Sequence, residues 1–116
     1  MQAYQYEMKT SRLEKLLEFY QEDPNDPFSS YALALEYQKN DTSQAEAAFE
    51  QLLAKFPDYL PSYYTAAQFF VSQDQNLRAE EIFKTGIQLA QFQQNTKAYQ
   101  ELVRAYRAFQ DEQMDW

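Results

Sequence analysis

The amino-acid sequence repeats itself at an interval of about 34 residues, a length typical of helical repeat proteins. Tyr37 is matched by Phe70, and Pro24 is matched by Pro57 at the same spacing. An Ala-x-x-x-Phe motif that begins at Ala45 recurs at Ala79. In proteins with such periods, each repeat is one small structural unit that buries its apolar face against its neighbours. The period therefore predicts a repeat protein, and such proteins mostly act by presenting a surface.

The composition predicts that the repeated units are helical. The chain of 116 residues contains one glycine and four prolines. Alanine, leucine, glutamate, glutamine and lysine fill the stretches between the aromatic residues, and these residues favour helices. Apolar side chains recur at helical spacing, every third or fourth position, along most of the chain. We therefore expect an all-α fold, a short α-α superhelix of antiparallel helix pairs.

The helix signals divide the chain into about six helices. Possible capping boxes begin at Ser11 and Ser43, and Asp26 precedes a proline at a first helical position. We predict one domain over residues 11–112. Its expected parts are a flexible arm over 1–10, a flanking helix over 11–22, repeats over 27–57 and 60–91, a second flanking helix over 95–111, and a tail over 113–116 that contains Trp116.

Charge and residue usage exclude several functional classes. The net charge is −8, which repels phosphate backbones and makes nucleic-acid binding unfavourable. The sequence has no cysteine and no histidine, so it lacks the commonest general base and the strongest nucleophile. We expect no enzyme activity, no metal and no cofactor. No stretch approaches the length of a membrane span, and the N-terminus lacks the pattern of a signal peptide, so we expect a cytoplasmic protein.

The repeated residues resemble those of the tetratricopeptide repeat, a helix–turn–helix unit of about 34 residues. The first repeat has Leu33-Ala34-x-x-Tyr37 and then Ala45-x-x-x-Phe49, and the second has Ala67-x-x-Phe70 and then Ala79-x-x-x-Phe83. The resemblance implies two full repeats with one unpaired helix at each end. The chain also resembles short bacterial proteins of this superfamily, a resemblance that brings no known activity with it.

The resemblance further implies where a ligand would bind. In proteins of this family, the first helix of each repeat lines a concave groove that accepts a peptide or a helix of a partner. Transferred by position, the predicted groove residues are Tyr31, Leu35, Gln38, Tyr64, Gln68, Val71, Lys97, Arg104 and Arg107. The tyrosines would supply large and stiff contact area with a hydrogen-bonding tip.

Two functions of different classes remain open. One is a protein–protein interaction module, an adaptor or scaffold that uses this groove. The other is a self-associating structural unit, a homodimer formed through the end helices or the N-terminal arm. The first helix is apolar for the polar cap that the end of a short repeat array needs, and this favours tight packing inside the chain or a dimer. Its apolar residues are Leu13, Leu16, Leu17, Phe19 and Tyr20. The identity of a partner is not encoded in any of these residues.

Overall fold

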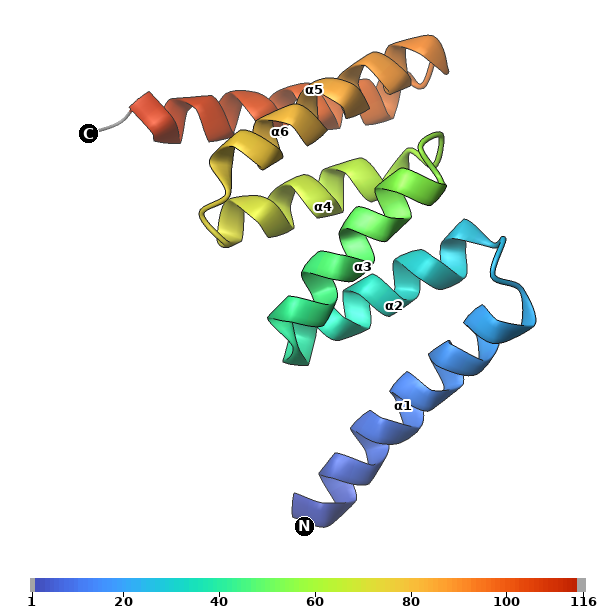
Figure 1. Cartoon of the computed structure of the whole chain (residues 1–116). Helices are drawn as coiled ribbons and strands as arrows, with labels where there is room; N and C mark the ends of the chain where they lie inside the picture. Colours follow the sequence, from blue (N-terminus) through green and yellow to red (C-terminus); the bar gives the residue numbers. More distant parts are fainter. Residues whose placement is uncertain (1, 115–116) are drawn as a thin grey trace. The chain divides into compact units, whose positions relative to one another are not determined.

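The computed structural model describes residues 2–114, with side chains from Arg12 onwards. Over these residues the chain forms six helices and no strand (Figure 1). The helices are α1 (Gln2–Glu22), α2 (Pro27–Asn40), α3 (Thr42–Lys55), α4 (Pro61–Ser72), α5 (Asn76–Phe92) and α6 (Thr96–Met114). The all-α class and the number of helices expected from the sequence are confirmed. Trp116, in the expected tail, lies outside the described residues.

The first helix is longer than the sequence analysis expects. The predicted helix over 11–22 begins at Gln2, so Ser11 lies inside the helix and the capping box assigned to it is wrong. The reason is local, because residues 2–10 contain no glycine or proline and include strong helix formers. The segment expected as an arm is therefore helical from Gln2 on, and its flexibility stays a prediction.

The chain divides into two compact units, one ending at Phe56 and the other beginning at Pro57. The N-terminal unit contains α1, α2 and α3, and the C-terminal unit contains α4, α5 and α6. The structure defines the packing inside each unit. The single domain predicted over residues 11–112 therefore stays a prediction.

In the N-terminal unit, α2 and α3 form a closely packed helix pair (Figure 1). Asp26 caps α2 by accepting a hydrogen bond from the Phe28 N–H at 3.0 Å, as the sequence predicts. Asp41 both ends α2 and caps α3, where its carboxylate accepts the Gln44 N–H at 3.1 Å. The capping box predicted at Ser43 is therefore wrong. A carboxylate at the N-cap position already satisfies an orphan amide and interacts favourably with the helix dipole.

Helix α1 is fixed to this pair by charged side chains. The Glu36 carboxylate is buried and lies 3.2 Å from Arg12 of α1 and 3.4 Å from Lys39. Just beyond the C-terminal end of α1, the Lys55 ammonium of α3 donates to the Pro24 carbonyl at 2.7 Å. These contacts connect all three helices, because Glu36 joins α1 to α2 and Lys55 joins α3 to the turn between them.

The core of the C-terminal unit combines small residues with aromatic ones. Ala67, Ala79 and Phe83 are each 0% exposed, and the Phe83 ring lies 5.6 Å from the rings of both Tyr106 and Phe109. Alanine at these contacts lets neighbouring helices approach closely while phenylalanine fills the space beside them. This burial defines the inner faces of α5 and α6.

The two turns of this unit have the same construction. Asp74 and Gln94 have positive φ angles of 59° and 57°. The residue after each one donates its N–H five positions back, Gln75 to Phe70 and Asn95 to Ala90, at 2.9 Å in both cases. This is the hydrogen bond of a Schellman motif, which satisfies a carbonyl at the helix end and reverses the chain. The motif sets the direction in which α5 and α6 return.

Candidate functional site

The predicted groove residues of α2 lie outside the buried face of that helix. Tyr31 and Leu35 are half-buried and Gln38 is exposed. Their spacing of four and then three positions places them on one side of the helix. The buried side carries Leu33 and Ala34, which are 6% and 0% exposed. The N-terminal unit therefore presents an amphipathic face with one tyrosine, Tyr31, towards the N-terminal end of α2.

Helix α4 shows the same arrangement with greater exposure. Tyr64 is 44% exposed, Gln68 is exposed, and Val71 is half-buried. Ala66 and Phe70 on the opposite side are both 0% exposed. Tyr64 is the more exposed tyrosine of the two predicted for the groove, so its ring is available for contact with another molecule.

Helix α6 adds three basic side chains. Lys97, Arg104 and Arg107 are all exposed, while Leu102 and Phe109 face the core at 2% and 6% exposure. The other exposed residues of α6 are mostly polar, with Ala108 and Met114 as exceptions.

All nine predicted residues thus lie off the core, on three helices. Those of α2 belong to the N-terminal unit, and those of α4 and α6 belong to the C-terminal unit. That the three faces form one groove stays a prediction.

Sequence reasoning missed a polar cluster between α5 and α6. The Tyr106 hydroxyl donates to the Glu80 carboxylate at 2.9 Å, and the Lys84 ammonium lies 3.5 Å from the same carboxylate. The hydrogen bond from Tyr106, followed by the charge of Lys84, lowers the pKa of Glu80. Burial, together with Glu80, raises the pKa of Tyr106. The cluster fixes α6 on α5, and its only sequence signal is the polar tip of a tyrosine on an apolar face.

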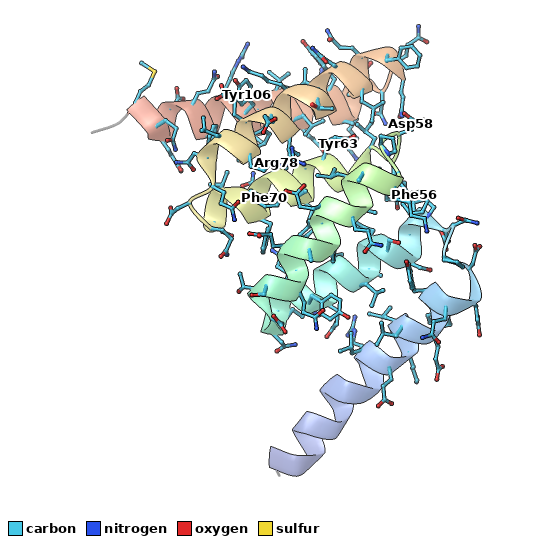
Figure 2. The ribbon with its side chains drawn as sticks, viewed as in Figure 1. Phe56, Asp58, Tyr63, Phe70, Arg78 and Tyr106 are labelled. Atoms are coloured by element: carbon cyan, nitrogen blue, oxygen red, sulfur yellow. The ribbon has the colours of Figure 1, made fainter. Side chains whose placement is uncertain are left out.

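A second polar contact holds the turn before α4. Tyr63 is 4% exposed, and its hydroxyl donates to the Pro57 carbonyl at 2.6 Å (Figure 2). The Gln93 amide donates to the Asp58 carbonyl at 2.9 Å. Burial raises the pKa of the Tyr63 hydroxyl, the Asp58 carboxylate raises it further, and Arg78 opposes this rise. The role of Tyr63 is therefore structural.

The raised pKa of Tyr63 predicts a loss of stability in alkali. The fold favours the neutral phenol, so the contribution is complete below the ordinary tyrosine pKa of about 10 and is lost as the pH rises through the higher value of the folded chain. We expect Tyr63→Phe to show a smaller alkaline decrease in the free energy of unfolding, measured by urea denaturation in steps upward from about pH 9. An equal decrease in the variant would contradict the assignment.

The N-terminal unit contains two pockets that the sequence did not predict. One, of about 200 Å³, lies among α1, α2 and α3, next to Tyr20, Tyr37 and Lys55. The other, of about 280 Å³, lies where α1 meets α2. It is bordered by Phe19 and Phe28, which are 55% and 63% exposed.

In the described part of the chain, no three acidic side chains gather where they could hold a metal ion. No helix there is long and apolar enough to cross a bilayer.

The paired helices and the internal period of the sequence define a helical repeat protein. The family model for the tetratricopeptide repeat matches residues 36–106. This match covers more than half of the chain, which therefore belongs to the tetratricopeptide repeat family. The resemblance noted in the sequence and the helical-repeat class are confirmed.

Solved structures of a bacterial repeat protein support the assignment. A solution NMR structure of a tetratricopeptide repeat domain protein from Salinibacter ruber is 36% identical, with a TM-score of 0.70, over 75% of this chain and 89% of that one. A crystal structure of such a domain protein from the same organism is 34% identical, with a TM-score of 0.68, over 73% of this chain and 97% of that one. No curated protein matches the sequence.

Membership of this family indicates a general function. Tetratricopeptide repeats generally act as protein–protein interaction modules, and the fold is generally a non-catalytic scaffold. As a member of this family, the chain is an interaction module with protein partners.

Proposed function

We propose that this chain binds a peptide or a helix of a partner protein through the predicted groove residues, among them Tyr64 of α4 and the basic side chains of α6. The observation that carries the proposal is the exposed ring of Tyr64, which stands on α4 opposite a fully buried face. Tyrosine on a rigid helix loses little conformational freedom on binding and supplies both apolar area and a hydroxyl.

The distribution of charged residues over the predicted groove would fix the orientation of a bound ligand. Lys97, Arg104 and Arg107 are exposed on α6, whereas the predicted residues of α2 and α4 are uncharged. A ligand would therefore place acidic residues, or its carboxyl terminus, towards α6 and apolar residues towards Tyr64. Such rim charges mainly set orientation and association rate.

Affinity capture with variants tests the proposal. The full chain, Tyr64→Ala and Arg104→Glu are each used to capture partners from a lysate of the organism that encodes the chain. Captured proteins are identified by mass spectrometry, and the affinity of the most enriched one is measured by calorimetry. Because buried interface tyrosines typically contribute more than about 1 kcal/mol, we expect Tyr64→Ala to weaken binding about tenfold.

Matched controls separate the groove from the rest of the surface. Phe92→Ala removes an aromatic side chain that is 86% exposed on α5, and Lys15→Glu reverses an exposed charge on α1. Both should bind like the unmodified chain. Identical partners and affinities for all five proteins would show that the groove is not the binding site.

Self-association through the end helices and a cytoplasmic location stay predictions. Phe19 on α1 is 55% exposed and Met114 on α6 is 78% exposed, so apolar groups are available at both helices. Light scattering over a range of concentrations tests this alternative, and a monomer at the highest concentration would exclude it.

A further inference from the structure

We propose that the pocket between α1 and α2 is a second docking site, which binds an amphipathic helix carrying lysine or arginine beside its apolar stripe. The site is lined by Leu16, Phe19, Glu22, Asp23, Asp26, Phe28, Ser29 and Ala32, and we call it the α1–α2 pocket. It lies within the N-terminal unit and does not include any of the nine predicted groove residues.

Among the described residues, no helix covers this part of α1 in the way that α2 covers the equivalent part of α3. Leu16 and Phe19 of α1 correspond, by the offset that relates Pro24 to Pro57, to Phe49 and Leu52 of α3. Phe49 and Leu52 are 0% and 1% exposed, whereas Leu16 is half-buried and Phe19 is 55% exposed. The same repeat positions are thus buried on α3 and open on α1.

The residues around Leu52 indicate which kind of element would cover Phe19. Helix α2 packs along α3, and Leu33 and Tyr37 of α2 line the same pocket as Leu52. In this pair, α2 is the first helix of the repeat and α3 is the second. By the same register α1 is a second helix, and no first helix covers it among the described residues. We infer that the occupant is a helix. A helix that packed against α1 in the way that α2 packs against α3 would cover Phe19.

Helix α2 contributes the other wall of the pocket. Phe28 is 63% exposed at its first turn, and Ala32 is half-buried one turn later. Two exposed phenylalanines from different helices, with a space of about 280 Å³ beside them, form an apolar site. The other exposed aromatic residues with described side chains, Tyr64 and Phe92, lie on α4 and α5. Grouped exposed apolar residues rimmed by polar ones are typical of interaction sites.

The acidic residues at the rim of the pocket favour a positively charged occupant. Glu22, Asp23 and Asp26 border the pocket, and none of the described residues that line it is basic. Asp26 is engaged in capping α2, and Asp23 accepts the Asn25 N–H at 3.2 Å. The exposed Glu22 carboxylate has no ion pair within the described residues. An incoming lysine or arginine could lay its aliphatic stem on Phe19 and its charge beside Glu22.

Charge also argues against a second copy of the chain as the occupant. A two-fold dimer through the same surface would bring the two acidic rims together, and like charges at an interface are unfavourable. The net charge of −8 adds to this repulsion over longer distances. A basic helix from a different protein has neither problem.

The test uses the full chain and two synthetic peptides. Both peptides carry the same leucine and alanine stripe at helical spacing. In one the flanking positions are lysine and arginine, and in the other they are glutamate. Binding is measured by fluorescence anisotropy, and the contact surface is mapped from backbone amide shifts. Because three carboxylates on the rim attract one peptide and repel the other, we expect the basic peptide to bind at least about tenfold more tightly than the acidic one.

Two variants and their controls locate the binding. Phe19→Ala should lower the affinity for the basic peptide about tenfold, because the substitution removes the apolar side chain on which the peptide packs. Glu22→Lys should reduce the difference between the two peptides. Phe92→Ala and Glu112→Lys make the same changes at exposed positions of the C-terminal unit and should have no effect. Circular dichroism confirms that each variant is folded, and Glu22→Lys decides the question should Phe19→Ala fail to fold.

The remaining outcomes overturn the proposal. Equal affinity for the two peptides, unchanged binding by Glu22→Lys, or no binding of either peptide at its solubility limit would each do so. Amide shifts confined to Tyr64 and Gln68 would place the peptide in the groove of the proposed function instead. A dimer that Phe19→Ala dissociates in sedimentation velocity would identify a second copy as the occupant. Conversely, Tyr64→Ala should leave binding at the α1–α2 pocket intact, so the two proposals can fail separately.

Discussion

Replacing Phe83 by alanine is expected to lower the free energy of unfolding by about 3–5 kcal/mol, as is usual for a fully buried phenylalanine. Phe83 is 0% exposed, and its ring lies 5.6 Å from those of Tyr106 and Phe109. The truncation removes the contact of α5 with two aromatic side chains of α6 and leaves a cavity. Because domains of this size are stable by only about 5–15 kcal/mol, the change should be evident in a urea melt followed by circular dichroism.

The control for this prediction is Phe92→Ala on the same helix. Phe92 is 86% exposed, so its truncation should change the free energy of unfolding by less than about 0.5 kcal/mol. A Phe83→Ala variant as stable as Phe92→Ala would contradict the packing described for α5 and α6.

Gly86→Ala is expected to destabilise the chain by about 1–3 kcal/mol, although alanine is the better helix former by about 1 kcal/mol. A methyl group at position 86 would lie 2.7 Å from Cβ and 3.2 Å from Cγ of Tyr63, and 3.3 Å from Cδ1 of Leu102. The closest atom, the Tyr63 Cβ, is fixed to the backbone of α4 and cannot rotate away. The variant is accommodated only if α4 and α5 move apart, which loosens the contact between them.

Thr85→Ala supplies the comparison for the glycine. Thr85 is the preceding residue of α5 and is exposed, so the substitution should leave stability unchanged or raise it slightly through helix propensity. Thermal and urea denaturation of both variants separate propensity from packing. If Gly86→Ala were the more stable of the two, the close approach of α4 and α5 would be wrong.

Much of the fold could be predicted because it depends on local patterns. Apolar spacing predicted the helices, Pro57 correctly marked the end of α3, and Asp26 correctly marked the start of α2. The errors were also local. Ser11 and Ser43 have the pattern of N-caps, but α1 continues through Ser11 and Asp41 caps α3 instead. Several residues near a helix end can satisfy the same amide, and sequence alone does not decide which one does.

The candidate surfaces were predictable to different degrees. Family register assigned Tyr64 to the concave groove; the residue is 44% exposed, and its place in a groove stays a prediction. The contact between Tyr106 and Glu80 and the α1–α2 pocket were both missed. They depend on which turn of one helix lies beside which turn of another, and this relation leaves no periodic signal.

The sequence by itself determined that this chain is a helical repeat protein, because the repeat period and the helical spacing of apolar residues are properties of the chain alone. Only the tertiary structure decided which apolar residues are exposed. Phe19 and Phe28 are exposed, whereas Leu52, which occupies the repeat position of Phe19, is buried. The physical reason is that burial depends on whether another helix lies against a residue. Equal repeat positions therefore differ in burial wherever the covering helix is missing.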